Sequence, residues 1–293
     1  MKKFIALLLA VIIFASVSTA AFAEGGQSRA VIGADLSEEQ IAAVYNAFEV
    51  QRGSVTELKM TNAEEREYLE GFVDSAIIGT RSISCVFVEL LGEGEGMSIS
   101  TANINWCTPE MYISALATAG ITDANIIVAA PVEVSGTAAL TGIYKAYEDM
   151  TGQKLDDIAK LVSTQELTIT GELAAQIGSF DSTAIVNELK LLLDETKKMS
   201  DSEIDAQIRA IAEQYNVKLT DGQVKQLLDL CRSLEKLDGE ALKARVEEVQ
   251  STLSKVSEAK TKIVGFVDTV KKVVSSVAEF FDKVKTALEG LKN

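Results

Sequence analysis

The sequence predicts an α+β (mixed α/β) protein: a small N-terminal α/β domain, then an all-helical region that ends in a long amphipathic helix with a heptad pattern. Fifteen of the 19 glycines and both prolines lie between residues 25 and 178, where turns would connect strands. The rest of the mature chain is nearly free of both residue types, which favours helix. We expect four segments, namely 1–23, 24–150, 151–238 and 239–293.

The first 23 residues have the order of a cleavable secretory signal. Lys2 and Lys3 precede an apolar run, and small residues end the segment at Ala23. Residues 4–23 are also uncharged and about long enough to span a bilayer, so an uncleaved membrane anchor is the alternative. We expect cleavage near Ala23 and a secreted, extracellular or cell-envelope location.

Two short helices open the α/β domain. Ser37 is placed as an N-cap ahead of apolar residues at helical spacing in residues 34–48. Thr61 and Glu64 form the pattern of a capping box, which predicts a second helix directly after Thr61.

Residues 81–91 and 97–106 predict two strands, and the Gly-rich stretch GEGEG between them predicts a hairpin that pairs them. In such a hairpin Cys85 and Cys107 would lie too far apart for a disulfide. Three cysteines are an odd number, so at least one is free or bonded to another chain. We expect Cys85 and Cys231 to be core residues and no bridge to be required.

The α/β domain continues as helix, strand and helix. A helix begins after Thr108, with proline in its first position, and ends at Gly120. The apolar run at 125–131 predicts a buried strand, and residues 137–149 predict the next helix.

Helix signals recur through 151–238. The segment GELAAQIG (171–178) ends on a glycine suited to a helix C-terminus, SDSE (200–203) is a capping box, and a further helix begins after Thr220.

The end of the chain predicts one long helix. Every seventh residue from Leu242 to Leu291 is apolar, and a second row four residues ahead is broken only by Lys260, with Gly265 as the expected bend. This stripe over 242–291 must pack against the helical region, against a second copy as a coiled coil, or on a membrane surface. We favour the packing within the chain.

Charge and composition exclude several functions. Without Lys2 and Lys3 the chain holds 26 basic and 43 acidic residues, a balance that repels nucleic acid and anionic lipid. The absence of histidine excludes Ser-His-Asp catalysis and His-containing zinc sites, and three dispersed cysteines make no metal site. We therefore predict no metal and no cofactor.

The loop SGTAALTG (135–142) is the best candidate for a ligand site. Small residues at the start of a helix suit an anion, and Arg81 with Ser135, Gly136 and Thr137 are the candidate binding residues. The loop lacks the lysine of a phosphate-binding P-loop. The structural alternative is that Ser135 or Thr137 caps the helix, while small residues such as Gly142 let it approach the sheet.

Several segments together resemble one family. They are IGADLSEEQ (32–40), TNAEEREYL (61–69), IGTRSISCVFVE (78–89), NINWCTPEMYISALATAGI (103–121), VAAPVEVSGTAALTGIYKAYE (128–148) and GELAAQIG (171–178). The chain is similar in these to the YpuA-like secreted proteins of Gram-positive bacteria, a domain of unknown function. The resemblance implies export and an envelope or extracellular setting. It implies no activity and no catalytic residues.

These observations favour a secreted or cell-envelope protein that acts by binding rather than catalysis. The partner would be a cell-wall component or an envelope protein, with self-association or membrane-surface contact through 242–291 as further routes. A secreted hydrolase or small-ligand-binding protein, with its site at the 128–137 strand end and loop, is the alternative.

Overall fold

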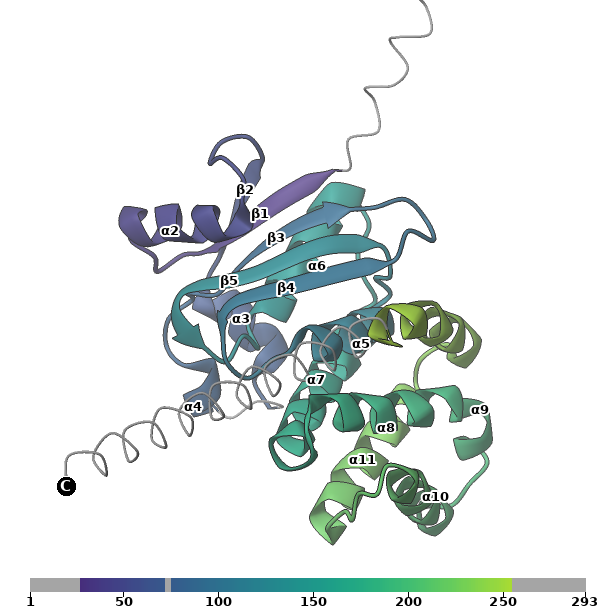
Figure 1. Cartoon of the computed structure of the whole chain (residues 1–293). Coiled ribbons are helices and arrows are strands. Elements are labelled where there is room, and N and C mark those ends of the chain that lie inside the picture. Colours follow the sequence, from purple (N-terminus) through teal and green to yellow (C-terminus); the bar gives the residue numbers. More distant parts are fainter. Residues whose placement is uncertain (1–26, 72–74, 255–293) are drawn as a thin grey trace, which may run out of the picture. The chain divides into compact units, whose positions relative to one another are not determined.

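The computed structural model describes residues 27–71 and 75–254 (Figure 1). The predicted signal segment, 1–23, and the heptad rows from 255 to 291 lie outside the described residues.

The chain divides into two compact units, and each is discontinuous in sequence. Unit 1 comprises the residues up to 107 together with 123–164. Unit 2 comprises 108–122 and the chain from 165 onward.

Unit 1 is built on a mixed five-stranded sheet with the order β2-β1-β3-β5-β4 (Figure 1). The strands are β1 (Ser28–Gly33), β2 (Thr56–Met60), β3 (Cys85–Leu90), β4 (Met97–Ile104) and β5 (Ala124–Val134). β1 and β2 run parallel, as do β4 and β5, whereas β3 is antiparallel to both of its neighbours. Together with the helices of unit 2, this sheet confirms the α+β class.

The predicted hairpin of 81–91 with 97–106 is wrong. β5 lies between β3 and β4, and Cys85 is opposite Ala129 of β5. The reason is burial: the first seven residues of β5 are all apolar except Asn125, so a central position shields this strand from water better than an edge position would. The short Gly-rich loop therefore joins two strands that are not neighbours.

Sequence reasoning also missed β1 and β2. Both are short, and β2, with the sequence TELKM, forms an edge of the sheet and is half exposed. Its strand structure depends on parallel pairing with β1, a contact that local composition does not reveal.

Helices α2 (Glu38–Phe48) and α6 (Ala139–Thr151) pack on the sheet through residues of opposite faces (Figure 1). Phe48 of α2 joins a core cluster with Ala30 of β1. Gly142 of α6 lies over the neighbouring residue Val31 and over Val86, where an added Cβ would come within 3.2 Å of the Val86 side chain. The expectation that small residues let α6 approach the sheet is confirmed.

The predicted helix starts of unit 1 are confirmed. Ser37 caps α2 in a capping box with Gln40, and Thr61 does the same for α3 (Asn62–Leu69) with Glu64. The one-turn helix α4 (Ser75–Ile78) follows.

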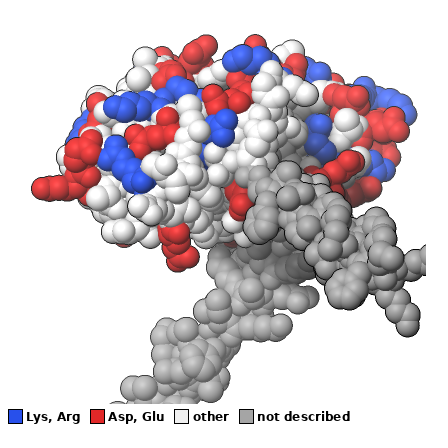
Figure 2. Space-filling model, turned by 90° about the horizontal axis from the view of Figure 1, so that it is seen from above, with Lys and Arg blue, Asp and Glu red and all other residues white. Residues whose placement is uncertain are grey.

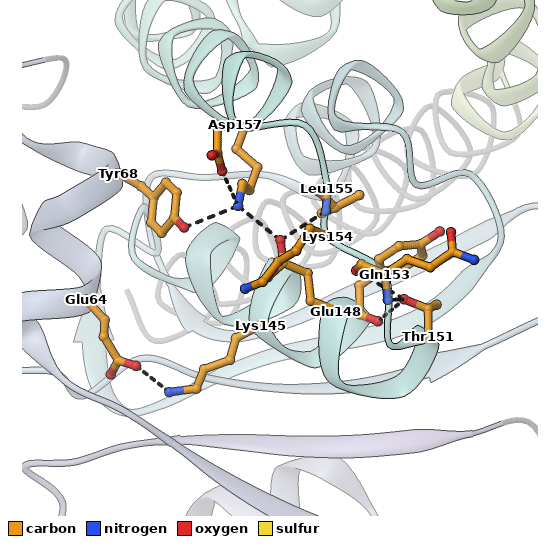
Figure 3. Close-up of polar contacts among 11 residues, drawn as sticks. Glu64, Tyr68, Lys145, Glu148, Thr151, Gln153, Lys154, Leu155 and Asp157 are labelled. Carbon is orange, nitrogen blue, oxygen red and sulfur yellow. Dashed lines mark hydrogen bonds and ion pairs between the residues drawn. The ribbon is translucent and has the colours of Figure 1, made fainter.

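A buried lysine ties three helices of unit 1 together. Lys160, near the start of α7 (Asp157–Ile177), donates to Asp157 (2.8 Å), Glu148 (3.0 Å) and the Tyr68 hydroxyl (3.2 Å). Figure 3 labels the three residues that accept from Lys160, namely Asp157 of α7, Glu148 of α6 and Tyr68 of α3. Burial alone would lower the pKa of Lys160, but the three hydrogen bonds raise it, so the ammonium stays charged. Its donors are all used, which indicates a structural role.

Unit 2 is helical. Its helices are α5 (Pro109–Ala119), the part of α7 from residue 165 onward, α8 (Ser179–Leu191), α9 (Leu193–Thr196), α10 (Asp201–Gln214), α11 (Asp221–Leu234) and the helical residues 239–254. Ser200 and Thr220 cap their helices as predicted, in capping boxes with Glu203 and Gln223. Thr108 is at the predicted N-cap position of α5, but its side chain makes no capping hydrogen bond. Gly120 and Gly178 end helices with positive φ angles, as their sequences predicted.

The described start of the heptad helix packs within unit 2. Leu242, Val246 and Val249 are at most 1% exposed, which confirms that the apolar stripe is buried there. Among residues 27–71 and 75–254, none of the helices combines the length and apolar character needed to cross a bilayer.

The cysteines are all buried and free. This confirms Cys85 and Cys231 as core residues and adds Cys107 to them. Burial raises the pKa of the Cys85 thiol to about 12, which keeps it protonated and unreactive.

A buried ion pair lies at the centre of unit 2. Lys190 of α8 and Glu166 of α7 are 2.7 Å apart and at most 1% exposed. Ser114 of α5 joins them: its carbonyl and hydroxyl oxygens each accept from Lys190 at 2.9 Å, and its hydroxyl lies 2.6 Å from Glu166. Thr118 donates to the other Glu166 oxygen at 2.5 Å. The network fixes α5 against α7 and α8.

Replacing one residue of this ion pair should lower the free energy of unfolding far more than replacing both residues together would. We expect Lys190→Met or Glu166→Leu to lower the free energy of unfolding by roughly 3–5 kcal/mol, because each leaves a buried charge without its partner. The double variant Lys190→Met/Glu166→Leu should lose much less than the sum of the single variants. Urea unfolding of the four proteins measures this.

The exposed pair of Lys225 and Asp229, 2.8 Å apart, provides the matched control. Lys225→Met should cost less than about 1 kcal/mol. Equal losses at Lys190 and Lys225 would contradict the role given to the buried pair.

Candidate functional site

A hollow of about 420 Å³ opens in unit 1 at the carboxyl end of β5. Residues from 78–84 form one wall and residues from 134–138 form the other. Three of the four predicted binding residues, Arg81, Ser135 and Thr137, line it, and Gly136 lies between the last two. Arg81 is exposed, Ser135 is half-buried and Thr137 is 1% exposed.

The pairing of β3 with β5 explains why these walls meet. Because the two strands are antiparallel, with Cys85 opposite Ala129, the chain that leads into β3 runs beside the chain that leaves β5. Residues about four positions before Cys85 therefore come close to residues about five positions after Ala129. Arg81 and Ser135, which are 54 positions apart in the sequence, are brought to one place by this register.

The 78–84 wall is fixed from below through Ser82. Its amide donates to the Asp35 carboxylate at 2.7 Å, its carbonyl accepts from the Asp35 amide at 3.2 Å, and its hydroxyl donates to Glu65 at 2.5 Å. Gly33 at the end of β1 allows this approach, because an added Cβ would lie 2.3 Å from the Ser82 carbonyl oxygen. A larger residue at position 33 would push the wall away.

The same contacts position Arg81. Its guanidinium donates to the Asp35 carbonyl at 2.7 Å, which uses one of its five N–H groups. Arg66 of α3 holds the neighbouring turn by donating to the Gly79 carbonyl at 2.6 Å. The Arg81 guanidinium, at the rim of the hollow, is therefore held on a segment that is itself fixed by hydrogen bonds.

The 134–138 wall is held by backbone hydrogen bonds. The Asn105 amide donates to the Val134 carbonyl at 3.0 Å, and the Cys107 amide donates to the Ser135 carbonyl at 2.9 Å. Gly136 has a φ angle of 89°, in the left-handed region that favours glycine. A side chain at this position would strain the turn whether or not the loop binds a ligand.

The capping interpretation of Ser135 and Thr137 is wrong. The N-cap of α6 is Ala138, and no side chain caps the helix. The two hydroxyl oxygens lie 3.3 Å from each other instead, at the edge of the hollow. The two hydroxyls thus lie beside the start of α6 but do not cap it.

The hollow has a positive polar rim and an apolar floor. Arg81 is the one charged side chain among its described lining residues. Ile78, Ile83 and Val134 supply apolar surface. Glu133, which the sequence places next to the loop, is exposed and is not among the described lining residues.

A second polar cluster, around Ser114 and Lys190, has the residue types of a catalytic Ser-Lys dyad, but it is buried where a substrate cannot reach it. Ser114 is 1% exposed and lies in the middle of α5. Its hydroxyl oxygen accepts from Lys190, and its one proton is shared between the Glu166 carboxylate at 2.6 Å and the Asn187 side-chain oxygen at 2.9 Å. The cluster is therefore a structural network, not a nucleophile.

Within residues 27–71 and 75–254, no group of three or more Asp, Glu or Cys side chains is arranged to hold a metal ion. Glu95 of the acidic GEGEG loop accepts a hydrogen bond from the Gly92 amide at 2.7 Å and so stabilises its own turn.

Sequence reasoning missed Gly33, Asp35 and Glu65, which support the hollow. Each acts on Ser82, between 17 and 49 positions away, and only the fold brings them together. A glycine directly after a β-branched run was the one local signal available, at Gly33.

Glu65 should make the stability of unit 1 depend on pH. It is 1% exposed, and burial raises its pKa to about 7 against the lowering effect of Ser82 and Asn62. The folded state therefore holds the proton more tightly than the unfolded state, so stability is greatest below about pH 4.5 and falls as the pH rises to about 7.

We expect Glu65→Gln to remove roughly 3 kcal/mol of this pH dependence, which urea unfolding between pH 4.5 and 7.5 measures. The chain has no histidine to titrate in the same range. Glu67→Gln, at an exposed position of the same helix, should keep the wild-type profile. Identical profiles for the wild type and Glu65→Gln would contradict the assignment.

Comparison with known proteins identifies the family but no activity. The family described as "Protein of unknown function (DUF1002)" matches residues 32–256. The "Uncharacterized protein YpuA" of Bacillus subtilis (strain 168) is 35% identical over 297 residues, covering 98% of each chain. No solved structure matches the chain. The family match includes both walls of the hollow, and the chain belongs to this YpuA-like family of proteins of unknown function.

Proposed function

We propose that this protein is an exported binding protein that captures a small acidic molecule, through a carboxylate or phosphate group, in the hollow of unit 1. The observation that carries the proposal is the pair of hydroxyls at Ser135 and Thr137, which do not cap α6 and which line the same hollow as Arg81. A tethered guanidinium with hydroxyl donors on the opposite wall is suited to an anionic group.

The start of α6 adds to this preference. The start of a helix carries partial positive charge from the aligned peptide dipoles. The amides of Ala139 and Leu140 here donate to the Gly136 and Thr137 carbonyls, at 3.0 and 3.3 Å, so the dipole and not free amides is the contribution of α6. Residues Thr137 and Ala138, at this helix start, line the hollow.

The floor of the hollow indicates the rest of the ligand. Ile78 is 6% exposed, and Ile83 and Val134 lie beside it in the lining. A volume of about 420 Å³ lies within the range of small-molecule pockets. The best fit is an acid with a short aliphatic body.

Binding without catalysis is favoured over the hydrolase alternative. Activation of Ser135 or Thr137 as a nucleophile needs an adjacent base. The described lining residues include no carboxylate, no lysine and no histidine, and each of these two hydroxyls has the other as its neighbour.

We place this activity outside the cytoplasm, at the cell envelope. The signal-like first 23 residues and the resemblance to exported Gram-positive proteins support this location. Nucleic acid is not proposed as a partner, because the chain is strongly acidic and the face in Figure 2 shows acidic and basic side chains interspersed over the described surface.

The ligand site should depend on Arg81. Isothermal titration of hexanoate and of inorganic phosphate into residues 24–293 should show saturable binding of at least one probe, and Arg81→Ala should weaken it by about 10- to 100-fold, because a charge-assisted hydrogen bond is lost. Arg81→Lys should recover part of the affinity. The control Lys59→Ala removes an exposed positive charge elsewhere in unit 1 and should change affinity less than twofold.

Two results would contradict the proposal. One is binding that is equal in the wild type and in Arg81→Ala. The other is equally tight binding of hexanol, which has the same aliphatic body without the acid.

The tail offers a separate route to an envelope partner. Leu242, Val246 and Val249 are buried within unit 2, so this part of the stripe serves the fold. Contact with the cell wall, an envelope protein, a second copy or a membrane surface is proposed for residues 255–291, which lie outside the described residues.

Co-sedimentation tests that route. Residues 24–293 should pellet with purified cell walls or with liposomes at low salt, and a chain that ends at 254 should not. The shorter chain keeps the buried part of the stripe, so its folding can be checked by circular dichroism. If the two chains pellet equally, the tail is not the targeting segment.

A further inference from the structure

A second hollow, of about 410 Å³, lies within unit 2 and has the opposite charge. One face of α8 forms its main wall: Phe180, Thr183, Ala184, Asn187 and Glu188 recur at helical spacing and all line it. Tyr215 at the end of α10, Glu110 of α5 and the helical residues 250–254 complete the described lining.

Three carboxylates surround this hollow. They belong to Glu110, Asp181 and Glu188, and no Lys or Arg is among the described lining residues. Burial, followed by the negative charges of Glu188 and Asp181, raises the pKa of the Tyr215 phenol, which places both carboxylates near that ring. The hollow therefore presents a negative potential and would repel anions.

One buried hydroxyl in this lining has no partner. Thr183 is 3% exposed, and its Oγ1 makes no hydrogen bond within the described structure. Leaving a buried hydroxyl unsatisfied is unfavourable, so a group bound at this position would gain a hydrogen bond that the folded chain does not supply. Thr183 lies on the face of α8 that lines the hollow, one turn from Asn187.

The neighbouring polar groups are rigidly held. The Asn187 side chain, 7% exposed, contacts the Ser114 hydroxyl at 2.9 Å and is thereby tied to the ion pair of Lys190 and Glu166. Glu110, 2% exposed, accepts a hydrogen bond from Ser179. A ligand would meet groups that are already in place.

The carboxylates are spread along the hollow rather than gathered at one point. In the described part of the chain no three acidic or cysteine side chains are close enough to hold a metal ion. An organic cation fits such a lining better than a metal ion does. Two aromatic rings, Phe180 and Tyr215, can flank an aliphatic chain, and oxygen acceptors suit a protonated primary amine better than a quaternary ammonium.

We propose that this hollow binds a small organic cation whose primary ammonium group donates a hydrogen bond to the Thr183 hydroxyl and is neutralised by Asp181 and Glu188. Free amines and the lysine side chains of peptides share this chemistry, and the experiment below distinguishes them with one probe of each kind. The site is independent of the acidic-ligand site proposed for unit 1, so either proposal can fail without the other.

Titration calorimetry with 1,5-diaminopentane and residues 24–293 tests the proposal at low and moderate salt. We expect saturable binding that weakens as salt rises, because the attraction is between charges. Asp181→Asn/Glu188→Gln should weaken it at least tenfold, and Thr183→Val should weaken it by about fivefold, the loss of one hydrogen bond. Nα-acetyl-lysine methylamide is the second probe, and tighter binding of it would assign the site to lysyl peptides.

Matched controls make the result decisive. Glu213→Gln removes an exposed negative charge from α10, outside the described lining, and should leave the affinity within twofold. Thr183→Ser keeps the hydroxyl and should retain binding where Thr183→Val does not. The proposal is overturned by the absence of binding of either probe at millimolar concentration, by equal binding of the dicarboxylate glutarate, or by equal weakening in Glu213→Gln.

Discussion

The position of β5 is the constraint on which unit 1 depends. This strand pairs antiparallel with β3 and parallel with β4, so it forms the link between the two halves of the sheet. The antiparallel register determines that the chain entering β3 meets the chain leaving β5. Arg81 and the Ser135–Thr137 loop therefore share one hollow, and α6 begins directly beside it.

Around this constraint, buried polar groups hold the candidate binding side chains in place. Asp35 and Glu65 fix Ser82, and Ser82 fixes the wall that carries Arg81. In unit 2 the ion pair of Lys190 and Glu166 fixes α5 against α7 and α8. Each network is costly to leave incomplete, which favours one arrangement over its alternatives.

The two hollows complement each other in chemistry. The one in unit 1 presents a guanidinium and hydroxyls, and the one in unit 2 presents carboxylates and an unsatisfied hydroxyl. A family that carries no assigned activity thus offers two separable binding hypotheses, each with its own residues.

The sequence was informative where structure is local. Helix starts at Ser37, Thr61 and Thr220 were predicted correctly, because capping depends on residues three positions apart. Strand order was predicted wrongly, since a short Gly-rich loop suggested a hairpin and the burial of β5 overrode it. Arg81, Ser135 and Thr137 could be selected as polar residues near a strand end, but Asp35 and Glu65 could not, because their role depends on distant contacts.

The central claim is that the β3–β5 register creates one binding site from two distant segments. An NMR titration of hexanoate into isotope-labelled protein tests it directly by following the backbone amides. The account predicts saturable shifts of the amides in 79–84 and in 134–138 with one common dissociation constant. Shifts confined to one segment, or scattered over both units, would contradict it.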